Sequence, residues 1–343
     1  MLRYPTRSPD DREAVIDATW WRWARPLVGA LVLVALVVGL GTGPFLDALR
    51  ATDARALTAG AFIALLTTLC GAWRWRLVAR RLGADLTLAE ALASCYRAQF
   101  LNVTLPGGVL GDVGRGVQHG RVGGDVGRGL RGVAWERTAG QVVLAVLTGA
   151  ALLLARPFDL ARLGGTSATV VGVLLLTTAA VAVVARMRGH RASRWLHLVA
   201  GDLRALAQGP ASVGIIVASV FAVAGHLATF VLAARTVGVR TPVVELLPLA
   251  LVVLLVSAVP LNLAGWGPRE GAATWAFAAA GLGAASGLAT AVAFGAIAFV
   301  GTLPGAVLLL AGRVRRHRPS VSAGPTAAGG PPRLDAVGGG SHG

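Results

Sequence analysis

The chain has 343 residues, of which 55% are hydrophobic and only 14% charged, and its mean hydropathy is +0.67. A soluble domain of this length carries about 25% charged residues, so a water-soluble globular protein is excluded. The net charge of +16 comes from arginine alone, because the 32 basic residues include no lysine. Basic excess can indicate nucleic-acid binding, but these arginines lie between apolar runs, as in membrane proteins. We expect an all-α polytopic membrane protein with no nucleic-acid partner.

The first part of the chain predicts a surface segment and two spans. Residues 1–26 place tryptophans beside arginines, which is typical of an anchor at the membrane surface, and 27–46 follow as the first span. A short loop over 47–55 leads to a second span over 57–73. That span ends in the basic run Trp73–Arg81, which belongs in the cytoplasm by the positive-inside rule.

The stretch Arg97–Arg115 interrupts the apolar pattern. Residues 87–104 fit an amphipathic helix, a proline and glycines end it, and glycines and arginines follow. We expect 87–130 to form a re-entrant hairpin that enters from the cytoplasm and returns to it, followed by a third span over 131–154. Irregular backbone at membrane depth is tolerated only where protein or a watery cavity surrounds it.

The second half of the chain repeats this order of elements. Further spans are predicted over 167–185, 212–235 and 286–312, with a basic cytoplasmic segment over 186–204. Residues 243–283 start and finish outside, so their interrupted stretch Val259–Gly271 makes a second hairpin, entering from the opposite face. We expect about six spanning helices plus two re-entrant broken helical hairpins in an inverted repeat. Paired interruptions of this kind point to a transport site.

The first interruption supplies most of the candidate substrate-binding residues. Proline ends the preceding helix and glycines permit close backbone approach. Free N–H groups at the start of the next helix suit an anionic group, and two arginines would add bidentate phosphate contacts. The alternative is a tight cytoplasmic loop in which Asp112 and Arg115 pair across one turn. The candidates are Arg97, Asn102, Pro106, Gly107, Gly108, Gly111, Asp112 and Arg115.

The second interruption and the start of the third span supply the other candidates. Arg269 lies between apolar segments, where charge is costly unless it lines water or meets an anion or a carboxylate. The alternative is a well-capped helix start with proline first and glutamate in the first turn. Glu136 and Arg137 are adjacent and therefore do not share a helix face. We expect them to contact different partners in one charged network; the alternative is that they anchor the helix at the membrane surface. These candidates are Glu136, Arg137, Asn262, Gly265, Gly267, Arg269 and Glu270.

No motif indicates catalysis, and we expect a non-enzymatic protein without cofactor or metal. A Walker A lysine motif is missing from the sequence, and the glycines at 107–116 do not match the dinucleotide fingerprint. Cys70 and Cys95 cannot form a disulfide framework. His226 fits a packed, hydrogen-bonded histidine.

Four motifs in this order resemble the flippase-like membrane family named after the transmembrane region of lysylphosphatidylglycerol synthase. They are the basic run Trp73–Arg81, the set Asn102, Pro106, Gly107, Gly111, Asp112 and Arg115, the pair Glu136-Arg137, and the set Pro260, Gly265, Gly267, Arg269, Glu270 and Gly271. The resemblance covers the chain from about 27 to 312, which we take as one transmembrane domain. Residues 313–343 are predicted to form a basic, then disordered, cytoplasmic tail.

The resemblance implies a multi-pass protein of the bacterial inner membrane, with both termini cytoplasmic, that moves lipids between leaflets. Its substrates would be anionic or aminoacylated lipids, either phospholipids or polyprenyl-phosphate-linked lipids. A lipid-modifying enzyme or a glycosyltransferase is a candidate partner. The soluble aminoacyl-transferring domain of the full synthase does not occur in this chain, so no lysyl transfer is expected from it alone. The alternatives are a membrane scaffold or accessory subunit, and a small-solute secondary transporter.

Overall fold

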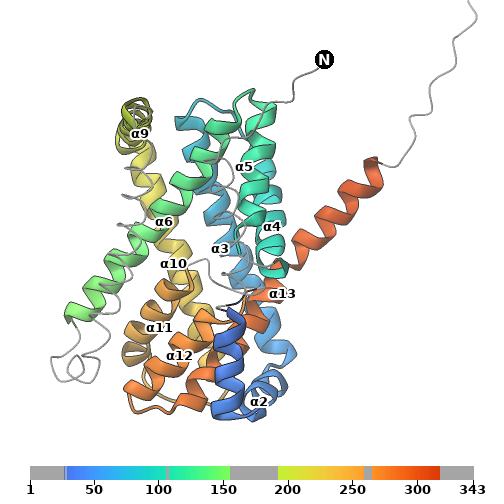
Figure 1. The fold of residues 1–343 in the computed structure, drawn as a ribbon, viewed down its shortest axis with the longest axis vertical. Helices are drawn as coiled ribbons and strands as arrows, with labels where there is room; N and C mark the ends of the chain where they lie inside the picture. The colour runs from blue at the N-terminus through green and yellow to red at the C-terminus, as the bar shows by residue number, and fades with distance from the viewer. Residues whose placement is uncertain (1–26, 28, 106–107, 155–191, 259–264, 317–343) are drawn as a thin grey trace, which may run out of the picture.

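The computed structural model describes residue 27 and residues 29–105, 108–154, 192–258 and 265–316, which form a helical bundle (Figure 1). Four of the described helices are long and apolar enough to cross a membrane, and a bent pair near the N-terminus makes up to five. The all-α membrane class is therefore confirmed. The span predicted over 167–185 lies outside the described residues.

Four predicted spans appear as helices longer than expected. They are α3 (Ala54–Arg81), α6 (Val126–Leu154), α10 (Pro210–Thr236) and α13 (Ala284–Arg316). The helix of the second span continues past residue 73, because the basic run is helical as well. Arginine and leucine are good helix formers, so the helix continues beyond its apolar part.

The span predicted over 27–46 is not one straight helix. The structure has a helix Gly29–Leu40 and then α2 (Gly43–Ala51), at an angle of 98° to it. Gly41 adopts a φ of 75°, which ends the first helix, and a proline in the first turn of α2 starts the second. The predicted loop over 47–55 consequently shortens to the residues between α2 and α3.

The first hairpin consists of two short helices, α4 (Leu88–Thr104) and α5 (Leu110–Val122). α4 begins with a capping box, in which the Thr87 hydroxyl and N–H hold the pKa of the Glu90 carboxyl below its ordinary value. The two limbs lie where the sequence predicted them. α6 begins at Val126, earlier than the predicted span at 131.

The second hairpin consists of α11 (Val243–Ser257) and α12 (Pro268–Ala279). α12 begins earlier than the predicted limb at 272, because Pro268 occupies its first turn and the Glu270 carboxylate accepts the N–H of Gly267 at 2.7 Å. Long, short, short and long helices thus follow one another twice, as α3 to α6 and as α10 to α13. In Figure 1, α4 and α5 lie in the upper half of the bundle, whereas α11 and α12 lie in the lower half.

The basic segment predicted over 186–204 contains a helix, α9 (Ala192–Ala207), in its described part. Figure 1 shows it almost end-on beside the upright α10, so it lies across the spans. Its Asp202 carboxylate accepts hydrogen bonds from Arg131 Nε at 3.0 Å and Trp135 Nε1 at 3.2 Å, both on α6. These contacts attach α9 to α6.

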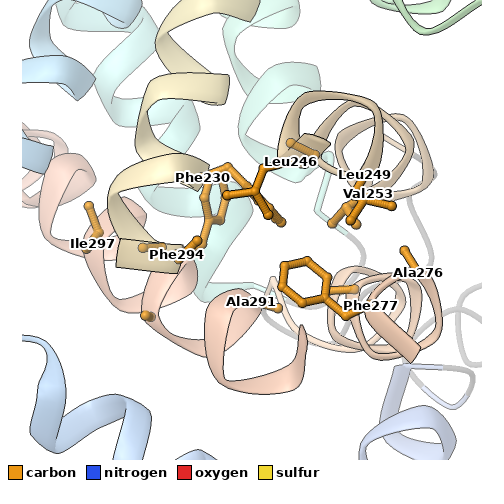
Figure 2. Close-up of a cluster of buried hydrophobic side chains, with 14 of the residues drawn as sticks. Phe230, Leu246, Leu249, Val253, Ala276, Phe277, Ala291, Phe294 and Ile297 are labelled. Carbon is orange, nitrogen blue, oxygen red and sulfur yellow. The ribbon is translucent and has the colours of Figure 1, made fainter. Parts of the chain in front are cut away.

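The main apolar core joins α10, α11, α12 and α13 (Figure 2). Phe230 of α10 lies at its centre, with ring centroids 6.3 Å from Phe277 and 6.1 Å from Phe294. Leu246 and Val253 of α11 complete the cluster and are fully buried. Glycines allow close helix contacts at some other places, as is common in membranes: a Cβ on Gly305 of α13 would overlap the carbonyl oxygen of Tyr96 on α4.

Candidate functional site

A cavity of about 390 Å³ lies between the two hairpins and the long helices, and we call it the central cavity. Both interrupted segments reach it, and Arg115 and Arg269 both line it. Its polar and glycine lining includes Arg74, Gln99, Asn102, Gly108, Asp112, Arg115, Glu136, Arg137, His226, Gly265 and Arg269.

Asn102 fastens the two helices of the first hairpin together. Its Nδ2 donates to Asp112 Oδ2 at 2.7 Å, and its Oδ1 accepts the N–H of Gly111 at 2.8 Å. One N–H group at the start of α5, that of Gly111, is therefore not free for an anionic group, because Asn102 already accepts it. Gly111 is required here, since a Cβ would overlap the carbonyl of Ala98 on α4.

Arg115 is buried and held by carboxylates on two helices. Its Nη2 donates to Asp112 Oδ1 at 3.0 Å and to Glu136 Oε2 at 2.9 Å, and only 6% of the residue is exposed. Its guanidinium carbon lies 4.8 Å from the centroid of the Trp75 ring. The one-turn pair with Asp112 is therefore present, but it is buried and lies in helix α5, not in a loop. Arg115 Nη2, expected to bind phosphate, faces two protein carboxylates in this structure.

Glu136 and Arg137 contact different partners, as predicted. The Glu136 carboxylate accepts from Arg115 and from Arg74, whose Nε lies 2.9 Å away. Arg137 pairs with Asp112 on α5. The result is a chain of alternating charges that links α3, α5 and α6.

Arg74 belongs to this network, although its place in the basic run Trp73–Arg81 predicted a cytoplasmic position for it. The side chain also donates from Nη1 to Ser219 Oγ on α10, at 3.2 Å. Helical periodicity is the signal that could have revealed it. Residues two apart on a helix point in directions about 200° apart, so Arg74 and Arg76 cannot both face the same solvent. Arg76 instead donates from Nε to the carbonyl of Leu86 at 3.1 Å.

Arg269 was expected to line water or to meet an anion or a carboxylate, and the structure shows it at a cavity and beside a carboxylate. It lines the central cavity, and its Nε donates to Glu270 Oε1 at 3.0 Å. The guanidinium lies 5.3 Å from the ring centroid of Phe294 and 5.7 Å from that of Trp266. Glu270 is fully buried and also caps α12. α12 therefore has the well-capped start that was the alternative, and Arg269 in its first turn also lines the central cavity.

Some predicted site residues do not join this cluster. Arg97 lines a separate cavity of about 510 Å³ and donates from Nε to the carbonyl of Ala93 at 3.2 Å. The structure therefore does not bring it into the central cavity. Pro106, Gly107 and Asn262 lie outside the described residues. Gly267 does not line the cavity: it has a φ of 120°, and a Cβ there would lie 2.7 Å from the Cα of Gly29.

The charges around the central cavity leave one positive charge in excess. Arg74, Arg115 and Arg137 face two carboxylates, Asp112 and Glu136, while Arg269 is balanced by its neighbour. Arg137 is the most accessible of these cations, with 49% of its side chain exposed against 4% for Arg115. One exposed cation in excess suits a single anionic group.

The sequence profile of the family described as "Lysylphosphatidylglycerol synthase TM region" matches residues 22–305. The chain belongs to this family. The match includes both hairpins and every residue named as lining the central cavity, so the charged cluster lies within the transmembrane region that defines the family. Comparison with curated proteins and with solved structures gives no match.

Proposed function

We propose that the protein translocates an anionic or aminoacylated lipid, either a phospholipid or a polyprenyl-phosphate-linked lipid, between the leaflets of the bacterial inner membrane. The observation that carries this proposal is the arrival of both interrupted segments at one charged cavity among apolar helices. Ionisable groups at membrane depth are costly and mark routes for polar substrates. In this proposal the headgroup enters the central cavity, while the acyl chains stay in lipid.

The arrangement of helices supports a transport cycle based on an inverted repeat. The order of long and short helices occurs twice, and the two hairpins lie in opposite halves of the bundle (Figure 1). We infer six spans, two re-entrant hairpins and cytoplasmic termini. Alternate opening of the two halves would expose the central cavity first to one leaflet and then to the other.

Arg137 is the residue best suited to bind the headgroup phosphate. Its side chain is half exposed, and it forms an ion pair with Asp112, which also accepts from Arg115 and Asn102. Asp112 would therefore keep two partners when Arg137 turns toward a phosphate. Arg115, in contrast, holds two buried carboxylates, and its movement would leave both partly uncompensated.

The internal pairing of the charges favours a second candidate function. A scaffold or accessory subunit for a lipid-modifying enzyme or a glycosyltransferase would need such a network only for packing. A small-solute transporter is the third candidate, since a cavity of about 390 Å³ falls within the size range of small-molecule sites. Lipid translocation accounts best for the accessible positive charge in excess at Arg137.

Leaflet exchange in reconstituted vesicles separates the three functions. Fluorescent lipids with anionic, aminoacylated and zwitterionic headgroups are compared, and the expected result is faster exchange of the first two. Arg137→Ala should slow exchange by roughly 10- to 100-fold, the value of one charge-assisted hydrogen bond. Arg121→Ala is the matched control, because Arg121 is exposed on α5 and lines no described cavity.

The remaining outcomes of these assays would favour the scaffold or the small-solute transporter. A wild-type protein that folds but exchanges none of the lipids would refute the flippase proposal and favour the scaffold. Uptake of a solute without lipid exchange would favour the secondary transporter. Exchange that proceeds equally fast in Arg137→Ala and Arg121→Ala would remove Arg137 from the substrate path.

A further inference from the structure

A groove of about 450 Å³ lies between α3 and α10, apart from the central cavity. It is at the end of the bundle where α9 lies across the spans (Figure 1). The two helices touch below it, because a Cβ on Gly214 of α10 would lie 2.8 Å from Leu77 Cδ1 of α3. The groove is lined by Trp73, Leu77, Arg80 and Arg81 of α3 and by the first turns of α10.

The groove is positively charged and contains no acid. Arg80 is exposed and Arg81 is half-buried, and no carboxylate lines the groove. Neither arginine forms an ion pair with any residue that the structure describes. The arginines of the central cavity, in contrast, are all paired. The two guanidinium groups of the groove therefore present an uncompensated surface charge.

The position of Arg81 adds a repulsion that an anion would relieve. A Cβ on Gly209, the N-cap of α10, would lie 2.7 Å from Arg81 Nη2, so the guanidinium rests against the start of that helix. A helix N-terminus carries a partial positive charge. α10 has 27 residues, and its start has neither an acidic residue in the first turn nor a side-chain cap. An anion between the guanidinium and the helix start would be attracted by both.

The remaining lining is apolar, so the groove suits an amphiphile. Trp73 is 39% exposed, and Leu77 and Pro210 continue the apolar wall away from the arginines. Tryptophan and arginine together are typical of the membrane surface, where lipid headgroups lie. A soluble anion would use the two arginines but would leave this wall uncovered.

We propose that this groove binds the headgroup phosphate of one anionic phospholipid as a resident lipid, with an acyl chain against Trp73 and Leu77. The site lies apart from the central cavity, so this lipid is held and not transported. Its existence does not depend on the function proposed above. Phosphate is the matching chemistry, because guanidinium groups bind it with two parallel hydrogen bonds.

The test compares lipid retention by the purified protein in detergent. Phosphatidylglycerol or phosphatidylcholine is added in mixed micelles, and the bound lipid is measured by native mass spectrometry of the intact complex and by the shift in Tm. We expect phosphatidylglycerol to be retained preferentially. The double variant Arg80→Ala/Arg81→Ala should weaken its binding roughly 10- to 30-fold, from two basic residues near an anionic lipid.

Three further variants distinguish a built site from general surface charge. Arg121→Ala/Arg204→Ala removes two exposed arginines outside the groove and should change binding less than twofold. Arg80→Lys/Arg81→Lys keeps the charge but loses the two parallel hydrogen bonds, so it should recover only part of the affinity. Ala211→Phe fills the groove from α10 and leaves both arginines in place, so it should also abolish retention, even if the double alanine variant fails to fold.

Specific results would overturn the proposal. Equal losses in the groove variant and in the Arg121/Arg204 control would show that overall charge retains the lipid. Equal retention of phosphatidylcholine would remove the role of the arginine pair. Displacement of phosphatidylglycerol by millimolar inorganic phosphate would assign the groove to a soluble anion. Leaflet exchange by Arg137→Ala tests the central cavity separately and does not bear on this result.

Discussion

The substitution Glu136→Gln tests the charge network that shapes the central cavity. Glu136 is 4% exposed and accepts hydrogen bonds from Arg74 and Arg115, so its neutral isostere leaves two buried cations less compensated. Breaking a buried ion pair by removing one partner costs about 3–5 kcal/mol. Because Arg115 keeps its contact with Asp112 at 3.0 Å, we expect a value near the lower limit, about 3 kcal/mol.

Thermal unfolding in detergent measures this loss. A cost of about 3 kcal/mol corresponds to a Tm lower by roughly 6–12 °C for a chain of a few hundred residues. Glu245→Gln is the matched control, because Glu245 is exposed in the first turn of α11 and should shift Tm by no more than about 1–2 °C. Combining Glu136→Gln with Arg74→Gln should recover part of the loss, since one unpaired cation is removed. Equal Tm values for Glu136→Gln and Glu245→Gln would refute the buried network.

Three further predictions concern the packing around the cavity, each measured as Tm. Gly111→Ala is expected to cost about 1–3 kcal/mol by overpacking against α4, whereas Gly114→Ala on the same helix meets nothing within 4 Å and should be neutral or stabilising. Gly305→Ala should likewise be destabilising, because a Cβ there would overlap the α4 backbone, while Gly312→Ala has open space. Matching Tm values within either pair would contradict the close helix contacts. Asn102→Leu removes two buried hydrogen bonds and should cost about 1–3 kcal/mol; an unchanged Tm would mean that Asn102 does not join α4 to α5.

Several elements of the fold could be predicted because their signals are local. Apolar length indicated α3, α6, α10 and α13, and the proline and glycine interruptions indicated the two hairpins. The bend after Leu40 was missed because apolar residues resume at Phe45, although Gly41 and Pro44 are residues that commonly end and start helices. α9 was missed as a helix because its arginines resemble a loop, while its tie to α6 depends on residues far away in the chain.

In the candidate site, too, local signals identified charged residues but not their distant partners. The sequence marked Arg115, Glu136 and Arg269 as charges that need partners, but it could not name all of those partners. Arg74 is 62 residues from Glu136 in the chain, and its inclusion in the network depends on the packing of α3 against α6. Arg97 was expected to bind phosphate together with Arg115, yet it lines only the second cavity, whereas Arg115 lines both cavities.

The sequence by itself determined the membrane class, the four long helices and the two interruptions that make the hairpins, because hydropathy and helix propensity act over one or a few turns. The tertiary structure alone decided that both breaks open onto one cavity, which arginine pairs with which carboxylate, and that Arg137 remains accessible. Those outcomes depend on distances between segments far apart in the chain. Glycine contacts and buried charge pairs set these distances, and no local pattern encodes them.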